Sequence, residues 1–430
     1  MINVRDFGAI GNGTADDTDA LQKALNLGGH ITVPAGTYLT GTLYLQSNTC
    51  LELEAGAVLL GTTDKSRYNA DGFCPQNCVF TVEHVTGAHL LVAVGQKNIT
   101  LCGDGVIDGN SHYWVNEHKR MGENSITFAP NDERPGQMIF FCECQNVSLR
   151  DLTLQNGPYW HLLLHGCTDV SVRGLKIYGE PLQYTNDGID LDCCRNVTVS
   201  DCIIRTGDDG ITIRAYGVPL VTPQDCENIV ITNCVISSFG DYGVRIGVGN
   251  RDIRHCLLSN LLIHDSHSGI GIISRFSPKS PGVNIEDIAV SDCKVDANRA
   301  LVIRMSNSDT HPAFPEPRHI SDIRISGLRG RFRQNAEILG HEGAELSDIK
   351  LNDCRFTAYG IAHTPDCDER GIWGCCCTDS AMEIRDANRV ILQDVGFDWE
   401  ENIGFHHDIH IQNSKVSVRG GEFPKGIAEE

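Results

Sequence analysis

The sequence has no long apolar run, and its first residues do not resemble an export signal. No stretch approaches the roughly 20 apolar residues that a membrane-spanning helix needs. The opening residues, MINVRDFGAIG, lack the basic start, apolar run and small-residue cleavage site of a secretory signal. Because the chain also has 19 cysteines, this absence predicts a cytoplasmic protein whose cysteines stay free thiols.

Basic residues are scarce relative to acidic ones. The chain has 35 Lys and Arg against 56 Asp and Glu, which gives a formal net charge of −21. Nucleic acids and anionic membranes both require basic patches, so we expect neither of them as a partner. A polyanionic substrate would need a local basic pocket set into this acidic surface. The sequence leaves open whether copies of the chain form a homo-oligomer.

Signals for a metal or a cofactor are weak or missing. No glycine-rich phosphate loop stands between a strand and a helix. His363, Cys367 and the cysteines at 375–377 could suggest zinc. Consecutive cysteines cannot easily all face one tetrahedral ion, however, and the usual Cys-x-x-Cys spacing is absent there. We therefore expect neither a metal nor a cofactor.

From residue 144 the chain repeats a unit of two short β segments separated by a polar turn. The clearest copies, CQNVSLRDLTLQN, CTDVSVRGLKIYG, CRNVTVSDCIIRT and CENIVITNCVISS, begin at Cys144, Cys167, Cys194 and Cys226. Self-similarity at this period indicates a solenoid, and β-branched segments without helices between them indicate a β-solenoid. We predict an all-β fold, a single-stranded right-handed parallel β-helix. The recurring Cys and Asn side chains would stack at its turns.

We expect the 430 residues to form a single domain, 1–430, because each unit of a repeat architecture contacts only its neighbours. Residues 12–29, NGTADDTDALQKALNLGG, predict an N-terminal capping helix with an apolar stripe and a Gly-Gly stop. Such a helix would cover the open end of the β-helix, which otherwise invites aggregation. Residues 111–137 and 305–320 are predicted to be loop insertions.

The densest constellation of acids lies in residues 184–214. Asp208 and Asp209 follow Asp187 by 21 and 22 residues, with a strand-like alternation between them. If one coil spans this interval, neighbouring strands about 4.8 Å apart bring the three carboxylates into one cleft. Carboxylates this close push each other's pKa values apart, which suits an acid and a base acting on one bond. The alternative is that these residues only form turns.

Several motifs resemble one enzyme family. NVRDFGAIGNGTADDTDALQKAL, VPAGTYLTGTLYL, TNDGIDLD and TGDDGITIR, in this order, are similar to the polygalacturonase family of glycoside hydrolases, family 28. The resemblance implies a right-handed parallel β-helix and hydrolysis of a glycosidic bond with inversion. It also implies that Asp208 is the general acid and that Asp187 and Asp209 activate water. Inversion predicts that acid and base lie roughly 6.5–9.5 Å apart.

Two family motifs are altered. The Gly-His-Gly motif falls at residues 241–243, where Tyr242 replaces the histidine, and the Arg-x-Lys motif falls near 271–273, where both basic residues are missing. In polygalacturonases these positions help to hold the substrate carboxylate, so a neutral sugar is as consistent with this chain as a uronate. Tyr242 could still hydrogen-bond to a sugar or stack on it.

Other residues could compensate for the missing basic groups. Strand alternation places Arg214 and Arg245 on one side of their strands, and Arg275 and Arg304 could add to them. Arginine suits a planar carboxylate through its bidentate fork. The alternative is that Arg214 and Arg245 pair with Asp190, Asp192 or the three central acids.

An aromatic group precedes the acids by one coil. Trp160 and His161 would form a platform for a sugar ring, and repeat alignment places His165 above Asp192. Core packing is the alternative for all three side chains.

Three functions remain open on the sequence. The first is an exo-acting, inverting glycoside hydrolase that acts on short oligosaccharides without a metal or cofactor. The second is a lyase, epimerase or glycosyl-transferring enzyme on the same scaffold, for which Tyr242 and Arg245 are candidate groups. The third is a carbohydrate-binding or structural β-solenoid without catalysis. Three crowded acids favour an enzyme, because a pure binding protein gains nothing from placing like charges together.

Overall fold

The computed structural model describes residues 1–78, 83–120, 128–130, 132–359, 380–400 and 405–430. The chain divides into two compact units. Unit 1 consists of Met1–Ile211 with Gly217–Gln224, and unit 2 of Thr212–Tyr216 with Asp225–Glu430. The single domain remains a prediction. Among the described residues, no helix is both long and apolar enough to span a bilayer.

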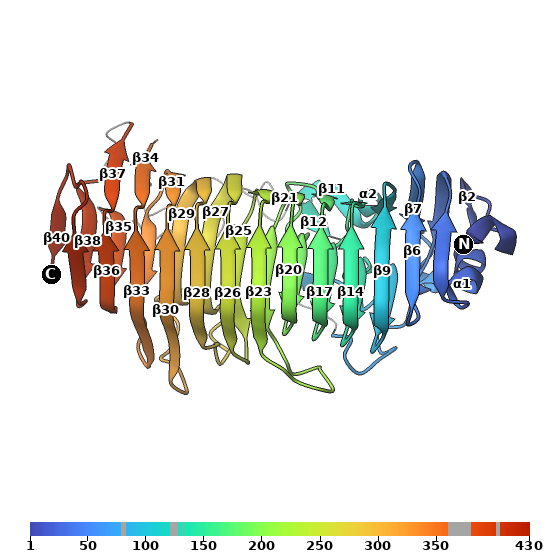
Figure 1. Ribbon diagram of the computed structural model, residues 1–430, viewed down its shortest axis with the longest axis horizontal. Coiled ribbons are helices and arrows are strands. Elements are labelled where there is room, and N and C mark those ends of the chain that lie inside the picture. Colours follow the sequence, from blue (N-terminus) through green and yellow to red (C-terminus); the bar gives the residue numbers. More distant parts are fainter. Residues whose placement is uncertain (79–82, 121–127, 131, 360–379, 401–404) are drawn as a thin grey trace. The chain divides into compact units, whose positions relative to one another are not determined.

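Unit 1 contains three rows of parallel strands, and Figure 1 labels the first row from β6 to β20. The first row is β1 (Ile2–Asn3), β3 (Gly29–Val33), β6 (Thr49–Leu53), β9 (Lys97–Gly103), β14 (Gln145–Arg150), β17 (Thr168–Arg173) and β20 (Arg195–Ser200). The second row is β2 (Asn12–Asp16), β4 (Gly36–Thr40), β7 (Ala57–Gly61), β10 (Val106–Asp108), β15 (Thr153–Gln155), β18 (Lys176–Tyr178) and β21 (Ile203–Thr206). The third row is β5 (Leu43–Tyr44), β8 (Leu91–Val94), β13 (Ile139–Cys142), β16 (Leu162–His165) and β19 (Ile189–Asp192).

Unit 2 repeats this arrangement. Its first row is β23 (Cys226–Thr232), β26 (Ile253–Ser259), β28 (Ile285–Ser291), β30 (Arg318–Ser326), β33 (Ala344–Asn352), β36 (Asn388–Gln393) and β39 (Val416–Arg419). Its second row is β24 (Val235–Ser238), β27 (Leu262–Arg275), β29 (Lys294–Ser306), β31 (Arg329–Phe332), β34 (Arg355–Ala358) and β37 (Gly396–Trp399). The long strands β27 and β29 run through both the second and the third row. The third row consists of these two strands together with β22 (Ile211–Ala215), β25 (Tyr242–Gly249), β32 (Ala336–Leu339), β35 (Ser380–Arg385), β38 (His407–Gln412) and β40 (Ile427–Glu429).

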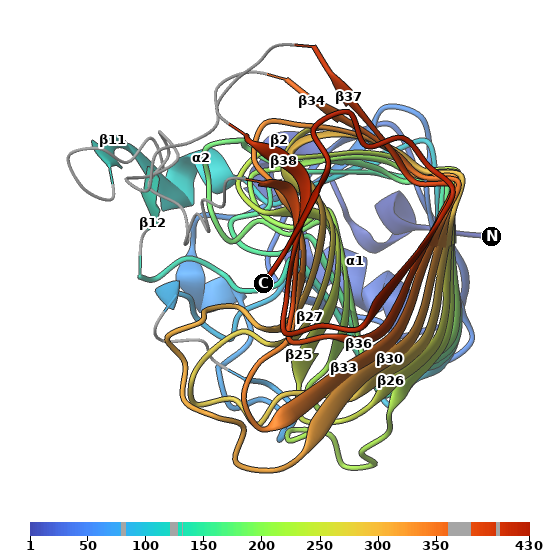
Figure 2. The same ribbon diagram turned by 90° about the vertical axis from the view of Figure 1, so that its left-hand side faces the viewer.

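Successive passes of the chain through these rows form the coils of a right-handed parallel β-helix, which confirms the predicted all-β fold. Within unit 2, Figure 2 shows β26, β30, β33 and β36 as one wall and β25 and β27 as another. Each wall buries alternate side chains. Val147, Val170 and Val197, for example, occupy equivalent positions on β14, β17 and β20 and fill the interior between the walls.

The turns are stabilised by stacked side chains, as the repeat predicts. Asn98 and Asn146 adopt the left-handed conformation, with φ of 57° and 55°, which asparagine tolerates better than most residues. The Asn146 amide donates a 2.8 Å hydrogen bond to the Asn98 side chain, which in turn donates at 2.7 Å to Asn48. These hydrogen bonds link the asparagine side chains of successive coils.

The repeating cysteines belong to the core. The thiols of Cys144, Cys167 and Cys194 are buried, and they donate to backbone carbonyl groups of the third row at 3.4, 3.3 and 3.1 Å. Burial raises the pKa of the Cys167 thiol well above its ordinary value. These cysteines are packing residues, and their regular spacing needs no catalytic explanation.

The N-terminal helix is shorter than predicted. Helix α1 spans Thr18–Leu25, whereas residues 12–16 form β2. The Asn12 side chain accepts hydrogen bonds from the backbone N–H groups of Thr14 and Ala15 at 3.0 and 2.8 Å. Such local side-chain bonds compete with helix formation, so the polar start of the segment turns back into a strand.

The predicted loops have partial structure of their own. Residues 111–137 include helix α2 (Ser111–Trp114) and an antiparallel pair formed by β11 (Val115–Arg120) and β12 (Phe128–Pro130). Two short 3₁₀ helices, η1 (Val4–Phe7) and η2 (Lys65–Arg67), lie elsewhere in unit 1. In unit 2, a loop leads from β29 to β30, so most of residues 305–320 form a connection outside the strands.

Candidate active site

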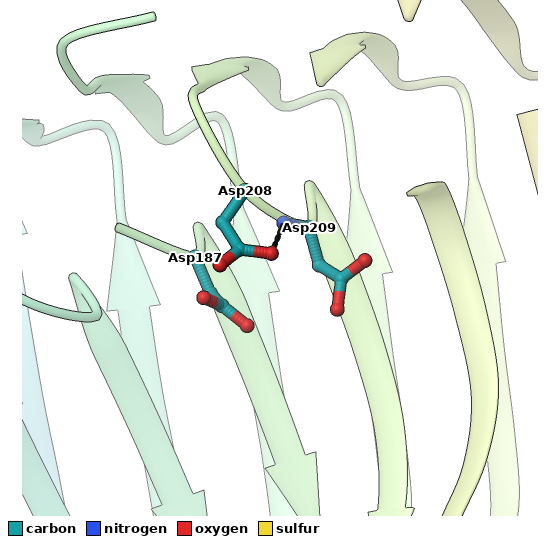
Figure 3. A group of neighbouring side chains, drawn as sticks. All are labelled: Asp187, Asp208 and Asp209. Atoms are coloured by element: carbon teal, nitrogen blue, oxygen red, sulfur yellow. Dashed lines mark hydrogen bonds between the residues drawn. The ribbon is translucent and has the colours of Figure 1, made fainter. Parts of the chain in front are cut away.

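The three predicted acids meet in unit 1. Asp187 lies in the turn before β19, and Asp208 and Asp209 follow β21. One carboxylate oxygen from each residue lies within 4.8 Å of the others (Figure 3). Asp187 and Asp209 have only 2% and 0% of their surface exposed, whereas Asp208 is half-buried. The repeat therefore brings one solvent-reachable acid and two buried acids to one point.

The distance between the nearest oxygens is a different quantity from the acid–base separation expected from the sequence. The prediction was roughly 6.5–9.5 Å, the spacing that leaves room for a water between two opposed carboxyl groups. The limit of 4.8 Å applies to one oxygen of each residue, so the separation between the carboxyl groups stays a prediction.

Asn186 links the two turns that carry the acids. Its side-chain oxygen accepts the backbone N–H groups of Gly207 and Asp208 at 2.7 and 3.1 Å. Its amide donates at 2.8 Å to the Glu180 carbonyl. Asn186 is fully buried, so these bonds are not exchanged with bulk water. The residue before Asp187 thus fixes the position of Asp208.

The Asp208 carboxylate is itself held by the backbone. Its Oδ2 accepts the N–H of Thr185 at 2.7 Å, and its Oδ1 accepts the N–H of Asp209 at 2.9 Å. Thr185 has a φ of 72°, an uncommon conformation for a β-branched residue, which turns its N–H towards Asp208. The Thr206 hydroxyl donates at 2.7 Å to the Asp208 carbonyl. The orientation of this side chain is therefore fixed before any substrate binds.

His161 supports the site from the interior, which corrects its prediction as a sugar platform. Its backbone N–H and its Nδ1 contact the Asp187 carbonyl at 2.8 and 2.9 Å. The Gly157 N–H donates to Nε2 at 3.2 Å, so Nδ1 carries the proton. Burial lowers the pKa of His161, which keeps the ring neutral. With both ring nitrogens engaged and no exposed surface, His161 positions Asp187.

The other two aromatic candidates of unit 1 are also buried. Trp160 stacks on Tyr159 with a 4.9 Å centroid distance and a 16° interplanar angle, which is the packing role kept open as the alternative. His165 pairs in register with Asp192 on the next strand, which confirms the repeat alignment.

The remaining substrate-binding candidates lie in unit 2. Arg214, Tyr242 and Arg245 are each less than a tenth exposed. Arg245 lies 3.9 Å from the Asp241 carboxylate and over the Phe276 ring at 5.4 Å. Their roles towards a substrate remain predictions.

Tyr242 fills the space beside Gly271. A Cβ atom at residue 271 would come within 2.6 Å of Tyr242 Cδ1 and Cε1. Burial raises the pKa of Tyr242 to about 12, so the phenol stays neutral at physiological pH. The Tyr242 ring therefore occupies the space that a side chain at residue 271 would need.

Arg275 and Arg304 are engaged within unit 2. Arg275 is fully buried, donates at 2.6 Å to the Pro312 carbonyl and stacks on the Phe314 ring at 3.9 Å. It thereby fastens the loop between β29 and β30. Arg304 pairs with Asp309 of the same loop at 2.7 Å. The structure gives both arginines a loop-holding role that the sequence prediction did not include.

Sequence reasoning missed a group of buried charges near Tyr242. Arg299 and Arg304 flank the buried carboxylate of Glu337 at 3.6 and 3.5 Å. Arg299 aligns with Tyr242 through Ser268 of β27. No local pattern reveals Glu337, because its strand carries a single acid among apolar residues.

Among the described residues, Asp187, Asp208 and Asp209 are the one group with a geometry that could hold a metal ion. Such an all-oxygen set suits a hard cation such as Mg²⁺ or Ca²⁺. The zinc candidates His363, Cys367 and residues 375–377 lie outside the described residues.

The fold and the three acids define a class of protein, the parallel β-helices with a cluster of aspartates on adjacent coils. A sequence model described as "Glycosyl hydrolases family 28" matches residues 28–377. The chain belongs to this family, as its motifs predicted.

The comparisons also identify individual relatives. The chain is 27% identical over 284 residues to a probable polygalacturonase of Vitis vinifera, covering 62% of this chain and 55% of the relative. It is 27% identical over 257 residues to an exo-poly-alpha-D-galacturonosidase of Dickeya chrysanthemi, covering 50% and 42%. The chain thus spans about half the length of the curated relatives that it matches. Its fold is similar to that of a family 28 exopolygalacturonase of Yersinia enterocolitica, with a TM-score of 0.69, 20% identity, and 97% of this chain and 78% of that chain covered.

Proposed function

We propose that this protein is a glycoside hydrolase that releases terminal sugars from uronate-containing oligosaccharides. The observation that carries the proposal is the approach of three carboxylates, from successive coils, to within 4.8 Å of one another. A binding protein or a structural solenoid has no use for such crowding, because it stores like-charge repulsion. A hydrolase uses such crowded carboxylates to hold a proton and a water at one glycosidic linkage.

The exposures of the three acids support the assignment of their roles. Asp208 is half-buried and can reach the leaving oxygen, and its two backbone hydrogen bonds hold it in place. It serves as the general acid. Asp187 and Asp209 are buried, and they hold the attacking water and take its proton. Acid and base groups positioned in this way each contribute about 10²–10⁴-fold to the rate.

The proposed substrate is a galacturonide chain cut from its end. Two relatives are described as a probable polygalacturonase and an exo-poly-alpha-D-galacturonosidase, and these names supply the sugar and the exo action as a proposal for this chain. The altered motif at Tyr242 and Gly271 argues that the carboxylate is held differently here. The alternative substrate is a neutral sugar, and a screen of substrates distinguishes it from a galacturonide.

The proposed stereochemical course is inversion. With two opposed carboxyl groups, a separation of about 5–5.5 Å accompanies retention and a wider one accompanies inversion. One oxygen of each acid lies within 4.8 Å of the others, a distance that a single water can bridge with hydrogen bonds of about 2.8 Å. We place this water against Asp187 and Asp209 together, on the side of the sugar away from Asp208.

A lyase reaction is less well supported by the structure. Tyr242 and Arg245 were the candidate groups for it, and Arg245 lies 3.9 Å from the Asp241 carboxylate. Tyr242 is 4% exposed, and burial raises its pKa to about 12. A phenol in this environment holds its proton at physiological pH and cannot abstract one from a sugar.

Hydrolysis of di- and trigalacturonide, followed by NMR, tests the proposal. We expect the first product to be the β-anomer, and we expect Asp187→Asn, Asp208→Asn and Asp209→Asn each to lose most activity with the fold intact by circular dichroism. Asp201→Asn is the matched control, because Asp201 is an exposed turn residue beside β20. Retention of the α-configuration, or normal turnover by Asp208→Asn, contradicts the proposal. Cleavage of neutral glycosides alone contradicts the choice of sugar.

A further inference from the structure

A basic groove lies on the outer face of the first row of unit 2. It has a volume of about 630 Å³ and is formed by β30, β33, β36 and β39. The first three of these strands lie side by side in Figures 1 and 2. The site with the three acids belongs to unit 1, so this groove is a separate feature built entirely from unit 2.

The charge of the groove is opposite to that of the protein. Its lining contains five cationic side chains and two carboxylates, whereas the whole chain carries a net charge of −21. The five cations are Arg324, Lys350, Arg389, Lys415 and Arg419. A local excess of positive charge in such an acidic chain attracts anions selectively, because anions are repelled from the surrounding surface.

Two of the five cations have internal partners. Arg324 pairs with Asp322 at 2.7 Å, and Arg389 donates to Asp348 at 2.6 Å. Within the part of the chain that the structure describes, Lys350, Lys415 and Arg419 form no ion pair. These three cations are available to an external anion.

The strand register places like charges next to each other. Arg324 of β30 lies directly opposite Lys350 of β33, and like charges at opposed positions destabilise a sheet. Lys350 in turn lies opposite the half-buried Ile391, which is followed by Ser417 on β39. The face thus combines cations with an apolar patch and a hydroxyl. A sugar ring that bears a carboxylate needs all three kinds of contact.

We propose that this groove binds a uronate chain through residues other than those of the site with the three acids. Lys350, Lys415 and Arg419 contact carboxylates on successive sugars, and Ile391 packs against the apolar edge of a ring. Bound in this way, a chain raises the local concentration of its own ends around the enzyme. The identity of the sugar rests on the proposed function, whereas the preference for an anionic chain rests on the groove alone.

The test is binding of sodium polygalacturonate to the Asp208→Asn protein, measured by affinity electrophoresis or biolayer interferometry at low salt. We expect the further replacements Lys350→Glu and Lys415→Glu to weaken binding about tenfold or more. The matched control is Lys176→Glu with Lys294→Glu, two exposed lysines on other strands, because it makes the same change in net charge. The control should bind like the parent protein. Fully methyl-esterified polygalacturonate, which lacks the charge, should bind neither protein well.

Each contrary result overturns the inference. Equal weakening by the groove pair and the control pair would show a general charge effect. Unchanged binding by the groove pair, or tight binding of the esterified polymer, would exclude the groove cations as the contact. Single-stranded DNA that binds as tightly as polygalacturonate and is lost with the same pair would make the site unspecific for uronates.

Failure of the proposed function gives a different result. A protein that hydrolyses no galacturonide but still loses polygalacturonate binding through the groove pair would keep this inference and reject the proposed reaction. In the active enzyme with Asp208 intact, the groove pair should leave kcat on digalacturonide unchanged and raise the KM for the polymer. A loss of kcat on digalacturonide would contradict a binding role.

Discussion

The ring of Tyr242 lies against Gly271, so closely that a Cβ atom at residue 271 would come within 2.6 Å of Tyr242 Cδ1 and Cε1. Tyr242 stands where family 28 motifs have a histidine, and Gly271 stands near the position of a motif arginine. The two positions are therefore in direct contact. The buried ring of Tyr242 also clusters with Ile273 and Val302.

This contact predicts a coupled stability effect. Gly271→Ala should lower the free energy of unfolding by about 1–3 kcal/mol, because the added methyl group overpacks the ring. In a Tyr242→Ala background the same change should cost much less, since the space is then open. Urea unfolding of the two single variants and the double variant measures the coupling. Gly72→Ala is the control, because a Cβ there meets nothing within 4 Å. Additive losses would contradict the contact.

Asn186 should matter for both stability and turnover. Asn186→Ala leaves the N–H groups of Gly207 and Asp208 without their acceptor, and each buried unsatisfied group costs about 1–3 kcal/mol. Because these bonds position Asp208, we expect kcat to fall about 100-fold, as a misplaced catalytic group does. Steady-state kinetics on digalacturonide and thermal unfolding measure the two effects.

The control for Asn186 is another turn asparagine. Asn146→Ala removes an exposed ladder bond to Asn98 and should leave kcat near the parent value. A full kcat in Asn186→Ala, with only the stability lowered, would show that Asn186 does not position the acid.

His89 predicts a loss of stability at mildly acidic pH. The ring is fully buried, contacts the Gln137 carbonyl and the Asn77 side-chain oxygen, and stacks on Phe140. Burial lowers the pKa of His89 to about 4. In the unfolded chain the histidine binds a proton below about pH 6.5, whereas the folded protein does not, so stability falls as pH decreases from about 6.5 to about 4. The contribution amounts to about 3 kcal/mol over this window, at 1.36 kcal/mol for each pKa unit.

Denaturant unfolding at pH 7.5, 5.5 and 4.5 measures this dependence. His89→Gln, which keeps a polar side chain but does not titrate, should be less stable at pH 7.5 and should lose less on acidification. The same slope in the parent and the variant would mean that other groups cause the acid sensitivity.

The fold could be predicted from the sequence wherever side chains follow a local period. The copies that begin at Cys144 and Cys167 gave the strands β14 and β17 because alternation and turn asparagines act within a few residues. The start of the predicted helix failed for a local reason as well, since the Asn12 side chain captures the backbone of Thr14 and Ala15. A hydrophobic pattern does not show such a competing bond.

The sequence predicted that the three acids lie together, but it predicted less about the residues around them. Asp187 and Asp208 are one coil apart, so their spacing alone brings them together. The roles of His161 and Arg275 depend on contacts with other parts of the chain. The His161 ring contacts a carbonyl group of the neighbouring coil, and the Arg275 guanidinium donates to a loop residue 37 positions further along the chain. Contacts of this kind are set by tertiary packing and leave no period in the sequence.

The most direct measurement compares two leaving groups in the Asp208→Asn variant. Digalacturonide needs a proton on its leaving oxygen, whereas α-D-galacturonosyl fluoride loses fluoride without one. If Asp208 is the general acid, the variant should lose about 10²–10⁴-fold on digalacturonide and keep most of its activity on the fluoride. Asp187→Asn and Asp209→Asn should lose activity on both substrates. An equal loss on both substrates in Asp208→Asn, or no loss on either, would contradict the assignment of the acid and with it the shared role of the three carboxylates.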